Sequence, residues 1–490
     1  MKSNTYYKIN KIYKKKKFFR GVNIMKFNSI EELLEYTENI KGKTFREIDS
    51  KNLLVNVGRH NKGLLGHIVE SGFYDYPINS DAHADFDNIG VELKVTGYTI
   101  NKNGRRRAKE RLVLSKINYF NVVNEEYNYS KLLFKNKKIL IIWYRYDYNK
   151  DVGDFLITDF QLYDMGKDED MFKNDFEIIK EKLKKGLAHE LSEGDTSYLG
   201  ACTKAAKSTD RTKQPYSNIL AKPRAFSLKN AYMTGILRNL AYEKETPSEN
   251  NMQRTLDEID ETFTLKTYKT VNEYINCKLE PYFGMNQLDI LEKVTRKNYS
   301  DKIPKNLNKI ITDKLIGKDE ELADKDDLFK KTSFIIKNLP ITPKNTPRER
   351  MSFRTLILSE FEENWDNSDW KIFFEQTTLI TILWKEPRSG SKNGERILDS
   401  VLKISFDDED LESFEKTYNL VKKTIENKDI KYLPVPGTFK NQYLVIAPKG
   451  VKGDDAYNNF FKKDKTKVSF MLSKEFLNKK IKQSNINLKK

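Results

Sequence analysis

The chain has 490 residues, of which 38% are hydrophobic and 32% charged, which is typical of globular proteins and not of disordered ones. It contains no run of about 18 apolar residues, so we expect no membrane-spanning helix, and its two cysteines predict no disulfide framework but a reducing, cytoplasmic environment. Of the net charge of +17, residues 1–24 and 462–490 carry +8 each, which leaves +1 for the rest. Net charge alone therefore does not indicate a nucleic-acid-binding protein.

The predicted elements begin after a basic N-terminal extension, residues 1–24. Ser29 and Glu32 have the spacing of a capping box, ahead of an amphipathic helix that ends near residue 40. A second helical pattern covers residues 61–76. Strand patterns follow at 91–95, 111–115, 138–146 and 155–160, and then a long amphipathic helix and a strand that runs into a helix. This order predicts an α/β fold.

The second half of the chain repeats the first in outline. The segments KLLFKNKKILIIWYRY (131–146) and AFSLKNAY (225–232) are echoed by KIFFEQTTLITILWKE (371–386) and SFMLSKEF (469–476) at similar spacing. The sequence therefore predicts a duplicated α/β fold. The predicted parts are the extension at 1–24, a catalytic domain at 25–243, a charged linker at 244–262 and a non-catalytic second domain at 263–490.

The stretch DAHADFDNIGVELKVT carries the strongest chemical pattern. Side chains alternate along a strand, so Glu92 and Lys94 share one face, and Asp85 can fold back to them across the turn DNIG. Two adjacent carboxylates repel unless a cation lies between them, and their hard oxygen atoms suit Mg²⁺. The pattern predicts a metal-dependent phosphodiesterase site, with helix residue Glu70 nearby. The alternative is a solvated strand face without chemistry.

These residues and the segment GLAHELSEGDTSYLGACTKAAKSTDRTKQPYSNILAKPRAFSLKNAYMTGIL resemble the MutH family, and more closely the two-domain type II restriction endonucleases related to it that cut at GATC. The resemblance implies a restriction-endonuclease-like core. It also implies that Asp85 and Glu92 bind Mg²⁺, that Lys94 assists the attacking water, and that Glu70 supports them. Asp87 lies two residues too near to Glu92 for the family spacing and is the second choice.

The resemblance further implies a DNA-reading region. Lys204 matches a family lysine that reads the recognition sequence, while Cys202 and Ser227 stand where MutH has an arginine and a tyrosine. Seven cations, including Arg211, lie between Lys204 and Lys229 against the single acid Asp210, a patch suited to DNA phosphates. A further family lysine corresponds to Lys137 or Lys138.

In the second copy, the alignment places Ile335 opposite Glu92 and Lys337 opposite Lys94, so this copy should not bind a metal or cleave. It keeps Lys449 opposite Lys204. The resemblance implies that it binds a second DNA site and assists cleavage, as a monomer or a transient dimer on DNA. A cognate methyltransferase would act on the same site without stable binding. The alternatives are a MutH-type mismatch-repair nicking enzyme and a non-enzymatic DNA-binding protein.

Overall fold

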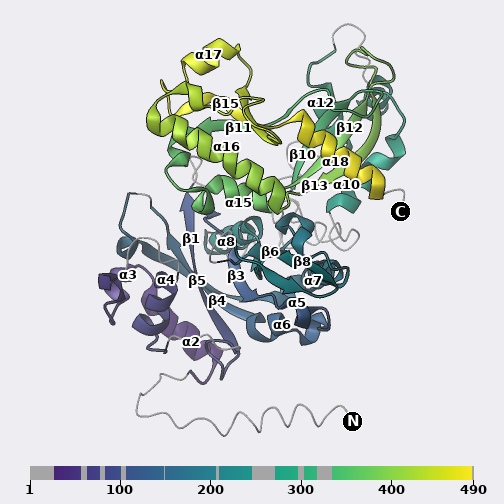
Figure 1. Cartoon of the computed structure of the whole chain (residues 1–490). Helices are drawn as coiled ribbons and strands as arrows, with labels where there is room; N and C mark the ends of the chain where they lie inside the picture. The colour runs from purple at the N-terminus through teal and green to yellow at the C-terminus, as the bar shows by residue number, and fades with distance from the viewer. Residues whose placement is uncertain are drawn as a thin grey trace, which may run out of the picture. The chain divides into compact units, whose positions relative to one another are not determined.

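The computed structural model describes residues 27–56, 63–77, 83–100, 106–147, 149–205, 209–245, 271–295, 303–316 and 334–487 (Figure 1). The predicted N-terminal extension and nearly all of the predicted linker lie outside these ranges. No helix among the described residues is long and apolar enough to cross a membrane. The chain forms two compact units, one from residues 1–95 and 139–162 and the other from residues 96–138 and 163–490.

The first unit contains short helices packed on strands. Its helices are α2 (Ile30–Thr37), α3 (Phe45–Ile48), α4 (Leu64–His67) and the π-helix η3 (Ile68–Phe73). A four-stranded sheet has the order β2-β1-β4-β5, formed by Arg106–Ala108, Val91–Ile100, Lys138–Arg145 and Leu156–Asp164, of which the start of β1 and nearly all of β4 and β5 belong to this unit. Strand β4 reads as an almost continuous apolar run and is buried along nearly its whole length, as expected for a central strand covered on both faces.

Two local predictions in this unit are confirmed in part. The Ser29 side chain caps α2 by accepting a hydrogen bond from the Glu32 amide, but Glu32 binds the Asn28 amide at 2.7 Å instead of completing a capping box. The single helix expected over 61–76 is a short α-helix that continues as the π-helix η3. Gly72 ends this segment against α3, where a Cβ atom would lie 2.8 Å from the Ile48 carbonyl oxygen.

The second unit begins with a three-stranded sheet of order β3-β9-β6, formed by Leu112–Lys116, Arg224–Leu228 and Leu199–Thr203. It is accompanied by helices α5 (Tyr119–Val122), α6 (Lys131–Asn136), α7 (Glu169–Lys184) and α8 (Asn230–Glu245), and by a hairpin of β7 (Thr212–Gln214) and β8 (Ser217–Ala221). The buried carboxylate of Asp175 on α7 accepts hydrogen bonds from the amides of Tyr198 and Leu199 at 2.6 and 2.9 Å. These bonds fix the start of β6 against the helix.

The C-terminal half contributes two further sheets to the second unit. One has the order β10-β12-β13 and the other β11-β15-β14. Their strands are β10 (Phe334–Ile341), β11 (Met351–Ile357), β12 (Thr378–Lys385), β13 (Ile397–Ile404), β14 (Leu444–Pro448) and β15 (Lys465–Leu472). The helices are α10 (Val271–Leu279), α11 (Gln287–Thr295), α12 (Leu307–Leu315), α15 (Asp369–Gln376), α16 (Asp408–Asn427), α17 (Gly453–Asn458) and α18 (Lys474–Asn487). Phe374, Phe414 and Phe470 lie at the centre of one apolar core.

The echoed sequence segments form the same kinds of element. Residues 131–146 and 371–386 each fold as a short helix followed by a buried strand, α6 with β4 and α15 with β12. Residues 225–232 and 469–476 each fold as a strand followed by a helix. By order of neighbouring strands within the sheets, β1-β4-β5 resembles β10-β12-β13, and β3-β9-β6 resembles β11-β15-β14.

The compact units do not follow the predicted boundary near residue 243. Part of the predicted first domain groups with the C-terminal half because polar contacts join them within the second unit. The Ser192 hydroxyl donates to the Phe406 carbonyl at 2.8 Å, and the Asn230 amide donates to the Gln376 side chain at 2.9 Å. Arg111 also forms ion pairs with both Glu193 and Glu375. Such contacts between residues more than 80 positions apart leave no local sign in the sequence.

Candidate active site

A tight turn at the start of β1 brings three of the predicted site residues together. The Phe86 amide donates to the Val91 carbonyl at 2.9 Å, and the Val91 amide donates back at 3.3 Å. Gly90 closes the turn with a φ of +66°, a left-handed conformation that favours glycine. The turn reverses the chain, so that Asp85 lies beside the first residues of β1.

Hydrogen bonds of side chains and backbone amides link Asp85, Glu92 and Lys94 into one cluster. The Leu93 amide donates to Asp85 Oδ2 at 2.9 Å, and the Asp85 amide donates to Glu92 Oε2 at 3.3 Å. Lys94 Nζ lies 2.5 Å from Glu92 Oε1. The Glu92 side chain is 1% exposed and that of Lys94 20%, so a carboxylate is held in the protein interior beside a cation that reaches solvent.

Apolar packing fixes this cluster in place. Phe86 is buried, and its ring centroid lies 5.1 Å from those of both Tyr74 and Tyr76. On β1, Val91 and Leu93 belong to the core of the first unit. Glu92 between them is buried as well, so burial does not alternate at the start of β1, and both faces of the strand are covered here. Rigid neighbours of this kind hold functional groups in a fixed geometry.

Asp85 and Asp87, the two candidate aspartates, lie in different surroundings. The Asp85 carboxylate is bonded to the β1 backbone, whereas Asp87 lies in the exposed part of the turn. Glu70 lies half-buried in the π-helix η3, and its supporting role stays a prediction. Lys137 is exposed and Lys138 half-buried at the start of β4, and the choice between them stays open.

The donor set of the cluster fits Mg²⁺. This ion is usually held by one or two carboxylates, with water molecules and substrate phosphates completing its coordination. Among the described residues no group of three or more His, Cys, Asp or Glu side chains could hold a metal ion. Asp85 and Glu92 would supply two carboxylates to the ion, and water and substrate would supply the rest. When bound, Mg²⁺ polarises a phosphodiester and lowers the pKa of a coordinated water. Lys94 uses one N–H on Glu92 and keeps two for a water or a phosphate oxygen.

The predicted DNA-reading residues divide into exposed and buried groups. Lys204, just after β6, and Arg211, just before β7, are exposed. Cys202 and Ser227 lie on the paired strands β6 and β9 and have no exposed surface. Burial raises the pKa of the Cys202 thiol. In this structure neither residue reaches solvent, so neither side chain is available to contact DNA.

Two cations of the basic patch are also internal. The Arg224 side chain is buried, donates to the Ala201 carbonyl at 2.8 Å and pairs with Asp408 at 3.1 Å. Lys229 is buried as well and donates to the Thr196 carbonyl. These two residues stabilise the fold, so the patch available to phosphates is smaller than the sequence suggests.

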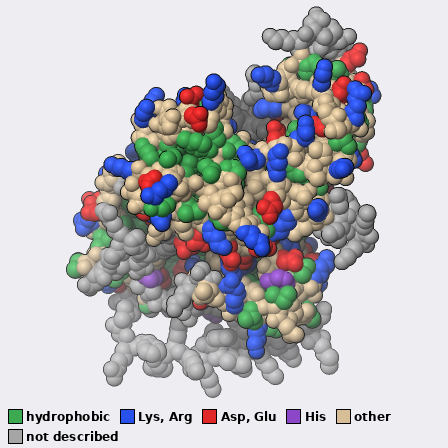
Figure 2. All heavy atoms as spheres, turned by 45° about the horizontal axis from the view of Figure 1, so that its top comes forward, with side chains coloured by type: hydrophobic (Ala, Val, Ile, Leu, Met, Phe, Trp, Pro, Cys, Tyr) green, Lys and Arg blue, Asp and Glu red, His purple; other side chains and the backbone are tan. Residues whose placement is uncertain are grey.

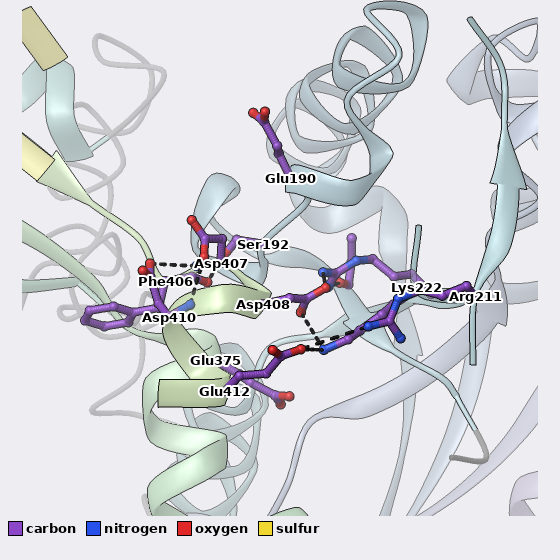
Figure 3. Close-up of polar contacts among 12 residues, drawn as sticks. Glu190, Ser192, Arg211, Lys222, Glu375, Phe406, Asp407, Asp408, Asp410 and Glu412 are labelled. Carbon is purple, nitrogen blue, oxygen red and sulfur yellow. Dashed lines mark hydrogen bonds and ion pairs between the residues drawn. The ribbon is translucent and has the colours of Figure 1, made fainter. Parts of the chain in front are cut away.

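Two further cations of the patch, Arg211 and Lys222, lie beside the acidic start of helix α16 (Figure 3). Lys222 Nζ lies 3.6 Å from Asp408 and 3.7 Å from Glu412. Arg211 is 4.0 Å from Glu412. A DNA phosphate would have to compete with these carboxylates for both cations.

The described residues on the face drawn in Figure 2 form no single basic stripe. Figure 2 shows Lys and Arg side chains spread over one face of the chain and interspersed with acidic ones. Charge alone therefore does not locate a DNA-binding face, in agreement with the near-neutral middle of the sequence.

The corresponding position in the C-terminal half lacks the carboxylates. Ile335 and Lys337 lie on β10, two residues apart as Glu92 and Lys94 are on β1. Ile335 packs against the apolar core of this half. The segment aligned with Asp85, within residues 328–331, lies outside the described residues. An aliphatic side chain cannot bind Mg²⁺, so this strand carries no counterpart of the Glu92 ligand.

An α/β fold with a carboxylate pair and a lysine at a strand start defines a site suited to metal-assisted hydrolysis of phosphodiesters. The family model described as DNA mismatch repair enzyme MutH matches residues 74–175, which include all three residues of the cluster. The type II restriction enzyme Sau3AI of Staphylococcus aureus is 34% identical over 349 residues, 68% of this chain and 68% of that protein. The chain belongs to the MutH-like type II restriction endonucleases, which are site-specific nucleases.

Proposed function

We propose that the protein hydrolyses both strands of duplex DNA at GATC sites with Mg²⁺ as its cofactor. The observation that carries this proposal is the cluster of Asp85, Glu92 and Lys94, in which a buried carboxylate lies 2.5 Å from a lysine amine. Asp85 and Glu92 bind the ion, Lys94 orients the attacking water, and Glu70 supports them. The GATC specificity follows from the family resemblance.

In this proposal, Lys204 and Arg211 recognise the DNA sequence. Both are exposed on the segment around the β7–β8 hairpin. Lysine and arginine donors can recognise guanine edges in the major groove, where every base pair has a distinct pattern of donors and acceptors. Arg211 and Lys222 would first have to exchange their contacts with Glu412 for contacts with DNA.

A second copy of the fold that binds another DNA site is also part of the proposal. The same strand orders in both halves support a duplication, and Ile335 in place of a metal ligand supports a copy without cleavage activity. Lys449 is its expected DNA contact. We further propose that the enzyme acts in the cytoplasm as a monomer or a transient dimer on DNA, beside a methyltransferase for the same site.

Digestion of a plasmid with Mg²⁺ tests the function and separates it from the alternatives. We expect a fragment ladder whose ends all map to GATC. A mismatch-repair enzyme would instead nick one strand of the plasmid, and a non-enzymatic binding protein would leave it intact while shifting its mobility. Either of these results, obtained with protein that is folded, would overturn the proposal.

The Glu412→Gln variant tests whether α16 competes with DNA for the basic patch. Glu412 is 57% exposed, and exposed ion pairs contribute ~0.2–1 kcal/mol. We therefore expect DNA affinity at low salt to rise by up to about fivefold. Glu409→Gln is the matched control, because Glu409 lies at the same helix start but pairs with Lys479. Equal affinity changes in both variants, measured by fluorescence anisotropy, would show a general charge effect instead.

A further inference from the structure

Two lysine amines of the C-terminal half converge on adjacent carbonyl groups. Lys337 Nζ, on β10, donates to the Ser352 carbonyl at 2.7 Å. Lys449 Nζ, just after β14, donates to the Phe353 carbonyl at 2.6 Å. Ser352 and Phe353 are consecutive residues of β11, so Lys337 from β10 and Lys449 from the end of β14 both reach one short stretch of backbone.

The local structure of β11 makes these carbonyls available. Its pairing with β15 is irregular between Ser352 and Thr355, so Phe353 is not part of the regular ladder. The Phe353 ring is buried, and Lys337 Nζ lies 5.5 Å from its centroid. Hydrogen bond and ring contact together fix the position of the Lys337 amine.

The pair has an excess of positive charge. Neither Lys337 nor Lys449 forms an ion pair with an acidic side chain in the part of the chain that the structure describes. Burial and the nearby Lys449 ammonium lower the pKa of Lys337, as expected for a partly desolvated cation beside a like charge. An anion between the two amines would remove this repulsion.

Lys337 on β10 aligns with Lys94 on β1, but the two lysines have different neighbours. On β1, Lys94 is neutralised by Glu92 at 2.5 Å. On β10, the residue two positions before the lysine is Ile335, which packs into the core. The lysine is kept while the carboxylate is replaced, which converts a site suited to a cation into one suited to an anion.

We propose that Lys337 and Lys449 form a binding site for one phosphate group of the DNA backbone. This inference rests on the proposed second-site binding and assigns its phosphate contact. Each amine uses one N–H on a carbonyl and keeps two, which is enough to bind both non-bridging oxygens of a phosphodiester. Charge-assisted hydrogen bonds of this kind position DNA without reading its sequence. Because the site supplies its own positive charge, binding there requires no Mg²⁺.

The test measures binding of short GATC duplexes to the full-length protein in EDTA. We expect the wild-type chain to bind two duplexes. Lys337→Gln and Lys449→Gln should each weaken one of the two binding steps by about tenfold and reduce its salt dependence by about one released counterion. Lys449→Arg should retain binding, and Lys440→Gln, which removes an exposed lysine elsewhere in the same half, is the control for net charge.

The outcomes distinguish a failure of the proposed phosphate site from a failure of the proposed second-site DNA binding. Two duplexes bound by the wild type, with both glutamine variants unchanged, would refute the phosphate site and leave second-site binding intact. A wild-type chain that binds one duplex would refute second-site binding and the phosphate site with it. Lys337 is half-buried, so a Lys337→Gln chain that fails to fold is replaced by Lys449→Gln, whose residue is exposed.

Discussion

Replacing Lys94 by alanine should reduce DNA cleavage by about a thousandfold, while site binding changes by less than about tenfold. The amine is the group of the cluster that reaches solvent, with 20% of its side chain exposed beside a Glu92 that is 1% exposed. Its free N–H groups can stabilise charge that develops on the phosphate during hydrolysis. Ground-state binding of a long duplex depends on many other contacts, so the loss appears in the rate of cleavage and not in affinity.

The controls for this variant are chosen from the same unit. Lys51→Ala removes an exposed lysine that pairs with Asp75, and it should leave cleavage unchanged. Asp85→Asn should inactivate the enzyme, whereas Asp87→Asn should not, because only Asp85 is bonded to the backbone of β1. Cleavage rates measured with protein in excess over DNA would decide this. Normal cleavage by Lys94→Ala would remove Lys94 from the mechanism.

Replacing Arg111 by alanine should lower the free energy of unfolding by about 3–5 kcal/mol, because this change leaves the buried Glu193 carboxylate without its ion pair and leaves Glu375 only the longer pair with Lys371 at 3.8 Å. The Arg111 guanidinium forms ion pairs with Glu193 and, at 2.5 Å, with Glu375. These carboxylates are 2% and 6% exposed. Burial already raises the pKa of Glu193, and Arg111 opposes this shift. Without Arg111, two carboxylates would face each other in the interior.

Denaturant unfolding of the variants checks this prediction. Arg46→Ala is the matched control, because Arg46 pairs with Asp154 on the surface, where both side chains are about half exposed. Its effect should be small, because solvent screens an exposed ion pair. Adding Glu193→Gln and Glu375→Gln to the Arg111→Ala chain should recover part of the stability that Arg111→Ala loses. Equal, small losses for Arg111→Ala and Arg46→Ala would show that the buried pairs do not stabilise the fold.

The sequence predicts the cluster of Asp85, Glu92 and Lys94 because its geometry is local. Strand alternation places Glu92 and Lys94 on one face, and a turn that ends in Gly90 brings Asp85 back to them, all within ten residues. The principal strands and long helices were predictable for the same reason, since each depends on the periodicity of a short segment.

The features that the sequence did not predict depend on distant contacts. The sequence predicts that Arg224 and Lys229 belong to a surface patch, but both side chains are buried. Arg224 pairs with Asp408 and Lys229 donates to the Thr196 carbonyl, and both partners are distant in the chain. Cys202 and Ser227 are buried in the strands of one sheet. The sequence of a single strand does not show which of its residues the rest of the fold covers. The π-helix after His67 likewise has the apolar spacing of an ordinary helix.

Anomalous diffraction from crystals of the protein with GATC DNA and Mn²⁺ in place of Mg²⁺ would test the central claim most directly. We expect one peak bonded to carboxylate oxygens of both Asp85 and Glu92, at a distance of about 2.2 Å and next to a DNA phosphate. No such peak is expected on β10, where Ile335 stands in place of a ligand. A metal ion bound elsewhere at the scissile phosphate, with Asp85 and Glu92 free of it, would contradict the account.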